Sequence, residues 1–165
     1  MVYLLGLEWV WRPQVNNLCY SVTFMATFNA QQLMQNNKII LFDGQCRLCS
    51  AWCNFIIKHD SKLHFKLCSV QSLKGQAILK HFSYPTDSFK TMIYVENSQC
   101  ITQSDGVINV VSQLGGLWRV VKILRIIPKS VRDWAYDRIA FNRYRLFGQY
   151  NYCVLPSDEY DQHYL

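Results

Sequence analysis

Residues 38–60, KIILFDGQCRLCSAWCNFIIKHD, restrict the fold more than any other part of the chain. The run KIILF is apolar and is followed by the turn signal Asp43-Gly44, which predicts a short strand that ends at this turn. Apolar residues then recur at helical spacing as far as His59, which predicts a helix that begins near Cys46. The residues with this spacing are Leu48, Trp52, Phe55 and Ile56. A strand that leads directly into a helix, with three cysteines at the junction, indicates an α/β domain.

The chain continues this alternation of strands and helices as far as residue 116. Strands are predicted over residues 63–70, 88–95 and 99–102, and helices over residues 72–82 and 104–114. Ser104 is a good N-cap for the last of these helices, and Gly115-Gly116 is a good stop. The predicted order from residue 38 is β-α-β-α-β-β-α, which is the order of a thioredoxin-like domain.

Residues 117–148 predict two additional C-terminal helices, because the segment is strongly amphipathic and is interrupted once, at Pro128. Its mixed aromatic and basic residues are Trp134, Tyr136, Arg138, Asn142, Arg143, Tyr144 and Arg145. Such a set could bind an acidic protein partner, an anionic membrane surface or nucleic acid. The alternative is a helix whose apolar side packs on the sheet while Lys and Arg stay in water. The sequence contains no nucleic-acid-binding motif, so we expect no nucleic acid partner.

The length of 165 residues, half of them hydrophobic, is enough to bury one core and predicts one domain. We expect residues 34–156 to form it, with residues 1–33 as a poorly ordered or non-native extension and residues 157–165 as a tail. No apolar run reaches the roughly 18 residues of a membrane-spanning helix, so we expect a soluble protein. Seven cysteines are an odd number and too few for a disulfide-rich secreted domain, which favours a reducing compartment, the cytoplasm.

Cys46 and Cys49 have the two-residue spacing of a redox-active pair. The thiolate is the attacking species, and unpaired N–H groups and the helix dipole at the first turn of a helix stabilise this anion. One helical turn brings Cys49 beneath Cys46, at a distance that a disulfide can close. We therefore expect Cys46 to be the nucleophile and Cys49 the resolving thiol. Arg47, which lies between them, adds positive charge.

Two other uses of the cysteines stay open. A zinc site would need two further ligands, which Cys53 with His59 or His64 could supply. The sequence has no second Cys-x-x-Cys or His pair at a usual spacing, so we expect no metal and no other cofactor. The pair could also be inert, with Cys53 as a small apolar core residue. The remaining cysteines, which we expect to be mainly structural, are Cys19, Cys68, Cys100 and Cys153.

Asp43 also has two interpretations. It could simply be the turn residue that ends the first strand. It could instead be a carboxylate beside the thiols, which relays the proton when Cys49 must ionise to attack a mixed disulfide.

The run LFDGQCRLC resembles the signature of the DCC family of predicted thiol–disulfide oxidoreductases, whose Asp-Cys-Cys pattern is here Asp43, Cys46 and Cys49. The similarity extends over residues 38–156, and its further parts are Asp60, SVQS at 69–72, QSDGVINVVSQLGG with Ser104 and Asp105, IIPKSVRDWAYDRIAFNRYRLFG, and Cys153 near Pro156. The resemblance implies a thioredoxin-like fold and a cysteine pair that cycles between dithiol and disulfide. Two positions depart from the expected pattern. Ser88-Phe89-Lys90 stands where thioredoxins have a cis-proline, and Gly106 replaces the usual Ala of a Ser-Asp-Ala motif.

The function that we expect is that of a thiol–disulfide oxidoreductase. Its partners would be a disulfide- or thiol-containing protein or small molecule and an external reductant. The alternative is a non-enzymatic thioredoxin-like scaffold that binds a protein or membrane surface through its basic C-terminal helices, residues 117–148. Turnover of a model disulfide separates the two hypotheses.

Overall fold

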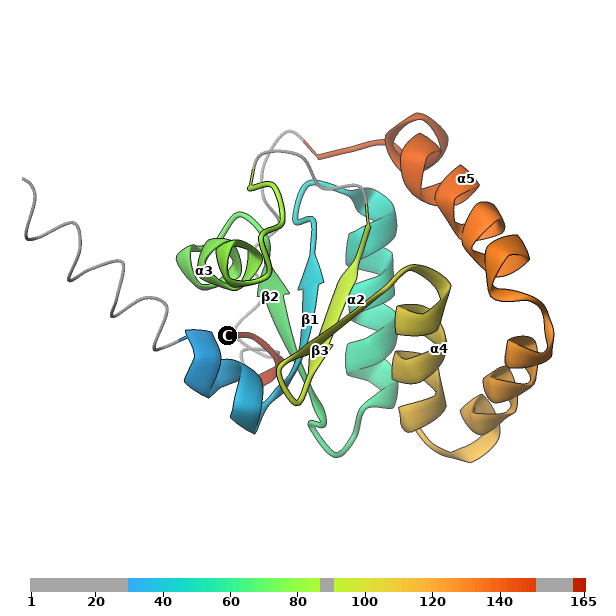
Figure 1. Cartoon of the computed structure of the whole chain (residues 1–165), viewed down its shortest axis with the longest axis horizontal. Helices are drawn as coiled ribbons and strands as arrows, with labels where there is room; N and C mark the ends of the chain where they lie inside the picture. The colour runs from blue at the N-terminus through green and yellow to red at the C-terminus, as the bar shows by residue number, and fades with distance from the viewer. Residues whose placement is uncertain (1–29, 87–90, 151–161) are drawn as a thin grey trace, which may run out of the picture.

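The computed structural model describes residues 30–86, 91–150 and 162–165 (Figure 1). The named elements are, in chain order, β1 (Lys38–Phe42), α2 (Arg47–His59), β2 (Phe65–Ser69), α3 (Leu73–His81), β3 (Ile93–Glu96), β4 (Gln99–Thr102), α4 (Gln103–Gln113), the 3-10 helix η1 (Gly116–Ile126) and α5 (Lys129–Phe147). This order confirms the predicted β-α-β-α-β-β-α core with additional C-terminal helices.

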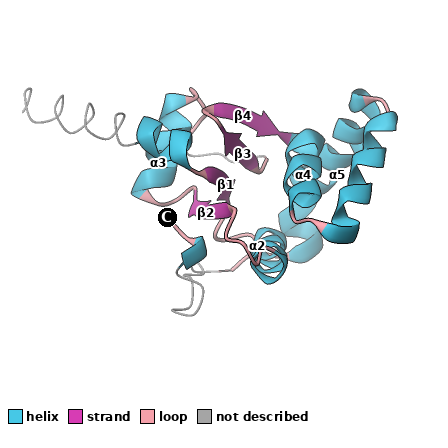
Figure 2. Cartoon of the chain, turned by 90° about the horizontal axis from the view of Figure 1, so that it is seen from below, coloured by secondary structure: helices cyan, strands magenta, loops and turns pink. Residues whose placement is uncertain are grey.

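The four strands form one mixed sheet in the order β2-β1-β3-β4. β1 pairs in parallel with β2 and antiparallel with β3, and β3 pairs antiparallel with β4. The parallel strands β1 and β2 are joined through α2, and the antiparallel strands β3 and β4 are joined by a tight turn. This is the arrangement of a thioredoxin-like fold. Helices cover both faces of the sheet: α2 and α4 lie on one face, and α3 lies on the other with residues 30–36, which are also helical (Figure 2). η1 and α5 lie beyond α4 (Figure 1).

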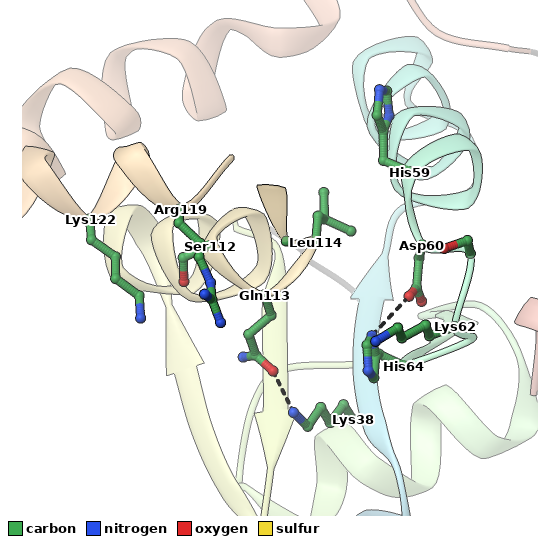
Figure 3. Close-up of a pocket in the computed structure, with 12 residues that line it drawn as sticks. Lys38, His59, Asp60, Lys62, His64, Ser112, Gln113, Leu114, Arg119 and Lys122 are labelled. Atoms are coloured by element: carbon green, nitrogen blue, oxygen red, sulfur yellow. Dashed lines mark hydrogen bonds and ion pairs between the residues drawn. The ribbon is translucent and has the colours of Figure 1, made fainter. Parts of the chain in front are cut away.

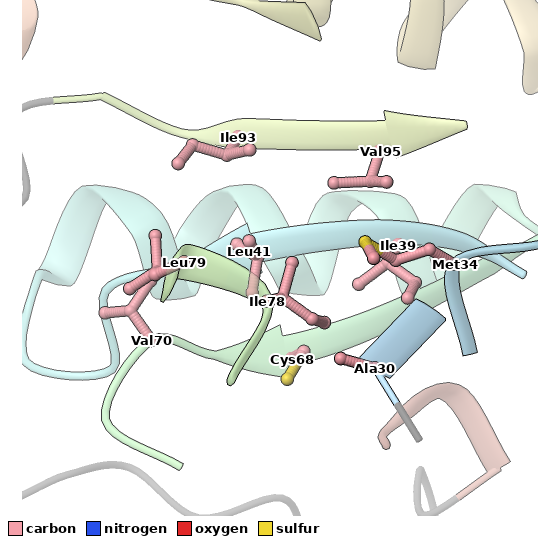
Figure 4. Close-up of a cluster of buried hydrophobic side chains, with 10 residues drawn as sticks. All are labelled: Ala30, Met34, Ile39, Leu41, Cys68, Val70, Ile78, Leu79, Ile93 and Val95. Carbon is pink, nitrogen blue, oxygen red and sulfur yellow. The ribbon is translucent and has the colours of Figure 1, made fainter. Parts of the chain in front are cut away.

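Side chains of β1 alternate between two hydrophobic clusters, one on each face of the sheet. Ile39 and Leu41 belong to the cluster under α3 and residues 30–36 (Figure 4), whereas Ile40 and Phe42 belong to the cluster under α2 and α4. This period of two is that of a strand buried on both faces. Because β1 is central and buried on both sides, the turn that follows it, which leads to Cys46 at the start of α2, has a rigid support.

Residues on both sides of the predicted domain boundaries add to this packing. The predicted start at residue 34 falls inside the helical residues 30–36, where Ala30 and Met34 are buried against the sheet. Residues 1–29 lie outside the described part of the chain. In the predicted tail, the Leu165 backbone N–H donates to the Leu67 carbonyl over 3.0 Å, so residues 162–165 lie along β2. The division into extension, domain and tail stays a prediction.

Two details differ from the sequence-based expectation. Ser104 is not the N-cap of α4: the cap is Thr102, and Ser104 is a buried helical residue whose hydroxyl donates to Asp133. A strong tertiary acceptor on α5 thus replaces the local backbone bond that a capping serine would make. Leu73 shares the apolar helical spacing of Ala77 and Ile78, yet it is 91% exposed, because it stands in the first turn of α3. The place predicted for the missing cis-proline, Ser88-Phe89-Lys90, lies outside the described residues.

Among the described residues, no helix combines the length and the apolar character that a membrane crossing requires.

Candidate active site

Cys46 is the N-cap of α2, in the position that the sequence predicts. Its backbone is extended, and its Sγ accepts a hydrogen bond from the Cys49 backbone N–H over 3.3 Å. A cap residue whose side chain accepts from an amide three positions later satisfies one of the orphan donors at the start of a helix. One helical turn separates the two residues, and the Cys49 side chain lies close enough to Cys46 to lower the pKa of its thiol. The sulfur of Cys46 is therefore placed where a negative charge is stabilised.

The two thiols have opposite acidities. The hydrogen bond from the Cys49 thiol, with that from the Cys49 backbone N–H and the charge of Arg143, lowers the pKa of Cys46 to about 6. The pKa of Cys49 is raised, because its proton is shared with Cys46 and because the thiol is buried. At neutral pH the pair therefore holds one negative charge, located on Cys46, and one proton, located on Cys49.

The thiol with the lower pKa, that of Cys46, is also the less exposed of the two. Cys46 has no exposed surface, whereas Cys49 is only partly buried. Residues 148–150, which follow α5, lie against Cys46: Gln149 forms a β-bridge with it, and the Tyr150 N–H donates to the Gln45 carbonyl over 2.8 Å. The Arg47 guanidinium lies 5.1 Å from the centre of the Tyr150 ring. The more acidic thiol is thus the covered one, and a substrate can reach it only after a local displacement.

Asp43 is buried at the end of β1, and both its carboxylate oxygens accept hydrogen bonds. Oδ1 accepts from the Gln45 backbone N–H over 3.0 Å and from Gln71 Nε2 over 2.8 Å. Oδ2 accepts from Arg143 Nη2 over 3.1 Å and from the Tyr144 hydroxyl. Burial alone would raise the pKa of this carboxyl, but the four hydrogen bonds outweigh burial and hold the pKa below its ordinary value. Asp43 is therefore ionised at neutral pH, and its acceptor positions are occupied.

Arg143 comes from α5 and is buried, with 8% of its surface exposed. Its guanidinium forms the ion pair with Asp43, and its positive charge lowers the pKa of both Cys46 and Cys49. The expectation that the basic residues of this helix stay in water is wrong for Arg143, although Arg138 and Arg145 are exposed. The reason is the packing of α5, which lies mainly against α4 and α2 and not on the sheet.

A pocket of about 310 Å³ opens beside the cysteine pair. Most of its lining is apolar and comes from α2 and α5, including Leu48, Trp52 and Ile139, and Cys49 and Arg143 also border it. Cys46 is not among the lining residues. The pocket therefore presents the Cys49 side of the pair to an apolar ligand.

Among the residues that the structure describes, the other cysteines and the histidines take no part in this site. Cys53 is buried in the core cluster under α2 and α4, and burial raises the pKa of its thiol. His59 contacts the Phe55 carbonyl, and His64 lies 3.2 Å from Asp60, so neither approaches Cys53 as a ligand pair would. Among the described residues, no three His, Cys, Asp or Glu side chains are grouped as metal ligands. Cys68 and Cys100 are free thiols, and Cys19 and Cys153 lie outside the described residues.

Of the site residues predicted from the sequence, the structure brings Asp43, Cys46 and Cys49 together. Sequence reasoning assigned no role in the site to Gln71, Arg143 or Tyr144. Gln71 lies within the SVQS run, and Arg143 and Tyr144 lie within the RYRLFG run, both of which were recognised as parts of the family resemblance. These motifs were the signal that could have identified the three residues.

Comparison with known proteins gives a consistent result. A family model described as DCC1-like thiol-disulfide oxidoreductase matches residues 40–149. An uncharacterised protein of Bacillus subtilis (strain 168), YuxK, is 41% identical over 129 residues, which are 78% of this chain and 94% of the relative. A chloroplastic DCC family protein of Arabidopsis thaliana is 30% identical over 118 residues, which are 71% of this chain and 69% of the relative. No solved structure matches significantly.

Proposed function

Because this chain belongs to the DCC1-like thiol-disulfide oxidoreductase family, we propose that it exchanges electrons with substrate disulfides by cycling Cys46 and Cys49 between dithiol and disulfide. The observation that carries this proposal is the position of the Cys46 sulfur, which caps α2 and accepts the Cys49 backbone N–H over 3.3 Å. In this position the pKa of the thiol is lowered to about 6, which favours the thiolate at neutral pH. A structural cysteine in an apolar core has the opposite shift, as Cys53 does.

The proposed reaction has two exchange steps. The Cys46 thiolate attacks one sulfur of a substrate disulfide, and the substrate S–S bond breaks as the mixed disulfide forms. The second substrate sulfur leaves as a thiolate and takes a proton from solvent. Cys49 then loses its proton to solvent and attacks the Cys46 sulfur, which closes the Cys46–Cys49 disulfide and releases the first substrate sulfur as a thiolate that solvent protonates. The substrate gains two electrons, and an external reductant returns two electrons to the protein.

We assign Arg143 a positioning and electrostatic role in the second step. Once Cys46 is part of a mixed disulfide, it no longer attracts the Cys49 proton, and the guanidinium of Arg143 still favours a Cys49 thiolate. Proton relay by Asp43 stays a prediction. Its lowered pKa and four hydrogen bonds make it a weak base toward a thiol, so we propose that Asp43 chiefly holds Arg143 beside the pair.

The partners that we propose are disulfide- or thiol-containing proteins or small molecules. The largely apolar lining of the pocket beside Cys49 favours substrates with apolar groups next to the sulfur. We propose the cytoplasm as the compartment, since the described cysteines are free and a reducing environment keeps the pair in its dithiol form between turnovers.

The test is to trap the mixed disulfide by mass spectrometry after mixing the reduced protein with an apolar model disulfide. Cys49→Ser should accumulate an adduct on Cys46, because the resolving thiol is missing, and Cys46→Ser should form little adduct and show no turnover. Cys100→Ser, which removes a partly buried thiol outside the site, is the matched control and should behave like the wild type. A wild type that never turns over would instead favour the scaffold hypothesis, and unchanged turnover in Cys46→Ser would exclude Cys46 as the nucleophile.

A further inference from the structure

η1 carries three lines of side chains, because it is a 3-10 helix. Three residues complete one turn of such a helix, so side chains three positions apart lie in line along it. The apolar ridge consists of Leu117, Val120, Ile123 and Ile126. The basic ridge consists of Arg119, Lys122 and Arg125. The third line consists of Trp118, Val121 and Leu124.

Trp118 of the third line contacts α2, whereas the apolar ridge is directed toward solvent and is more exposed than Trp118 (36%) or Leu124 (44%). The Trp118 ring packs edge-on at 4.9 Å from the centre of the Phe55 ring and 5.2 Å from that of His59. The four residues of the apolar ridge are 92%, 63%, 62% and 82% exposed, in chain order. Soluble proteins rarely expose a contiguous line of large aliphatic side chains, and such a line marks a contact surface.

Positive charge surrounds this apolar ridge. Residues 116–127 contain three basic residues and no acidic residue. Arg119 and Lys122 also border a pocket of about 390 Å³, whose other wall carries Lys62 and Lys38 (Figure 3), the latter paired with Glu96 at 3.0 Å. Asp60 is the one carboxylate in this lining, and it is paired with His64 at 3.2 Å. The surface around η1 therefore combines an exposed apolar ridge with an excess of positive charge.

We propose that η1 lies on the surface of an anionic lipid bilayer. The apolar ridge would enter the boundary between headgroups and acyl chains, while the basic ridge meets lipid phosphates. Long Lys and Arg side chains can keep their charges at the headgroup level while their neighbours are buried in the bilayer. A protein partner would need an apolar groove flanked by carboxylates, whereas any anionic bilayer presents acyl chains and phosphates together along the whole length of η1. The contact is peripheral and does not depend on the proposed redox function.

The test is co-sedimentation of the full chain with vesicles. Binding is expected to vesicles of phosphatidylcholine and phosphatidylglycerol in equal parts, to be much weaker with phosphatidylcholine alone, and to fall as salt is raised. Ile123→Asp should lower partitioning into the vesicles by about tenfold or more, because it removes an apolar contact and adds a charge that the anionic lipid repels. Lys122→Glu should have an effect of the same size, because it replaces a cation that meets lipid phosphate by an anion. Leu73→Asp and Lys80→Glu are matched controls on α3, since both residues are exposed and lie outside η1, and neither should change binding.

Other outcomes would overturn the proposal. Equal binding to neutral and anionic vesicles would remove the role of the basic ridge. Absence of vesicle binding, together with a dimer in size-exclusion chromatography that Ile123→Asp dissociates, would identify a second copy of the chain as the occupant. Disulfide turnover in solution, measured on the same variants, should be unchanged, so a failure here is distinguishable from a failure of the redox proposal.

Discussion

Asp43 and Arg143 are 100 positions apart in the sequence, yet Asp43 Oδ2 lies 3.1 Å from Arg143 Nη2 in a buried ion pair. The pair joins the end of β1 to α5 directly beside the cysteines. Through this pair, a charged residue of the C-terminal helix acts on the pKa of Cys46.

Arg143→Met should both destabilise the protein and make Cys46 less acidic. Removal of one partner leaves a buried carboxylate unpaired, which costs about 3–5 kcal/mol of unfolding free energy. The pKa of Cys46 should rise, because the charge of Arg143 lowers it in the wild type. Urea unfolding measures the loss of stability, and thiolate absorbance against pH measures the pKa of Cys46.

Arg145→Met, at an exposed position on the same helix, is the control for this prediction. The double variant Asp43→Asn with Arg143→Met should be less unstable than Arg143→Met alone, because it leaves no unpaired buried carboxylate. An unchanged pKa of Cys46 in Arg143→Met would contradict the electrostatic role.

Alkylation of Cys46 by iodoacetamide should rise with pH through a midpoint near 6, which is the pKa of this thiol. The hydrogen bond from the Cys49 thiol is the first cause of the shift. Cys49→Ala should therefore move the midpoint upward, and Cys49→Ser, which keeps a hydroxyl donor, should move it less. Peptide mass spectrometry assigns the modified cysteine. Equal midpoints in the wild type and Cys49→Ala would show that the thiol of Cys49 does not set the acidity of Cys46.

The stability of the reduced protein should also depend on pH. The pKa of Cys46 is about 6 in the folded protein against an ordinary value of 9.0, so between these values the unfolded state binds more protons. Relative to Cys46→Ser, the wild type should gain stability as pH rises from about 6 to 9.0 and lose this contribution as pH falls through about 6. Above this range the raised pKa of Cys49 acts in the opposite sense. Denaturant midpoints of both proteins at several pH values give the comparison, and parallel curves would refute the expectation.

Gly148→Ala should expose Cys46. Gly148 has φ 79° and ψ 177°, a conformation that is essentially restricted to glycine, and it leads into the residues that lie against Cys46. A side chain there should displace residues 149–150 and speed alkylation of Cys46. Gly115→Ala is the matched control, because Gly115 has nearly the same conformation, φ 84° and ψ −174°, far from the cysteines along the chain. Equal alkylation rates in both variants would mean that residues 148–150 do not limit access.

Gly75→Ala should destabilise the fold, because a Cβ at this position would lie 2.1 Å from the Ser69 carbonyl oxygen. α3 packs against the end of β2 at this point, and neither backbone can move freely. We expect a loss of about 2–3 kcal/mol in unfolding free energy, measured in urea. Leu73→Ala in the same helix is nearly fully exposed and should change stability by less than about 0.5 kcal/mol.

Local patterns predicted the elements that carry the cysteines. KIILF is β1, and the apolar spacing from Leu48 to Ile56 gave α2 with its start at Cys46, because both signals arise from neighbours in the sequence. The acidity of a thiol at that cap follows from backbone geometry, which is also local. The sequence could therefore identify Cys46, Cys49 and Asp43 as neighbours.

The residues that complete the site depend on how α5 packs, and periodicity does not determine this. Residues 117–148 were predicted as amphipathic helices with their charged side in water, but within α5 Arg143 is buried and Phe141 is 60% exposed. Ser104 was misassigned for the same reason, since its acceptor, Asp133, is supplied by a helix distant in sequence. The Arg143–Asp43 and Ser104–Asp133 contacts depend on how distant helices pack, which the local pattern of a single sequence does not predict.

Cys46 has two tasks in the structure, since one sulfur is both the proposed nucleophile and the acceptor for the Cys49 amide at 3.3 Å. When that sulfur enters a disulfide, it loses its negative charge and becomes a poorer acceptor, so the first turn of α2 loses part of its anchoring. Oxidation would then loosen the very turn that made the thiol reactive, and amide hydrogen exchange at the start of α2 would report the oxidation state of the protein.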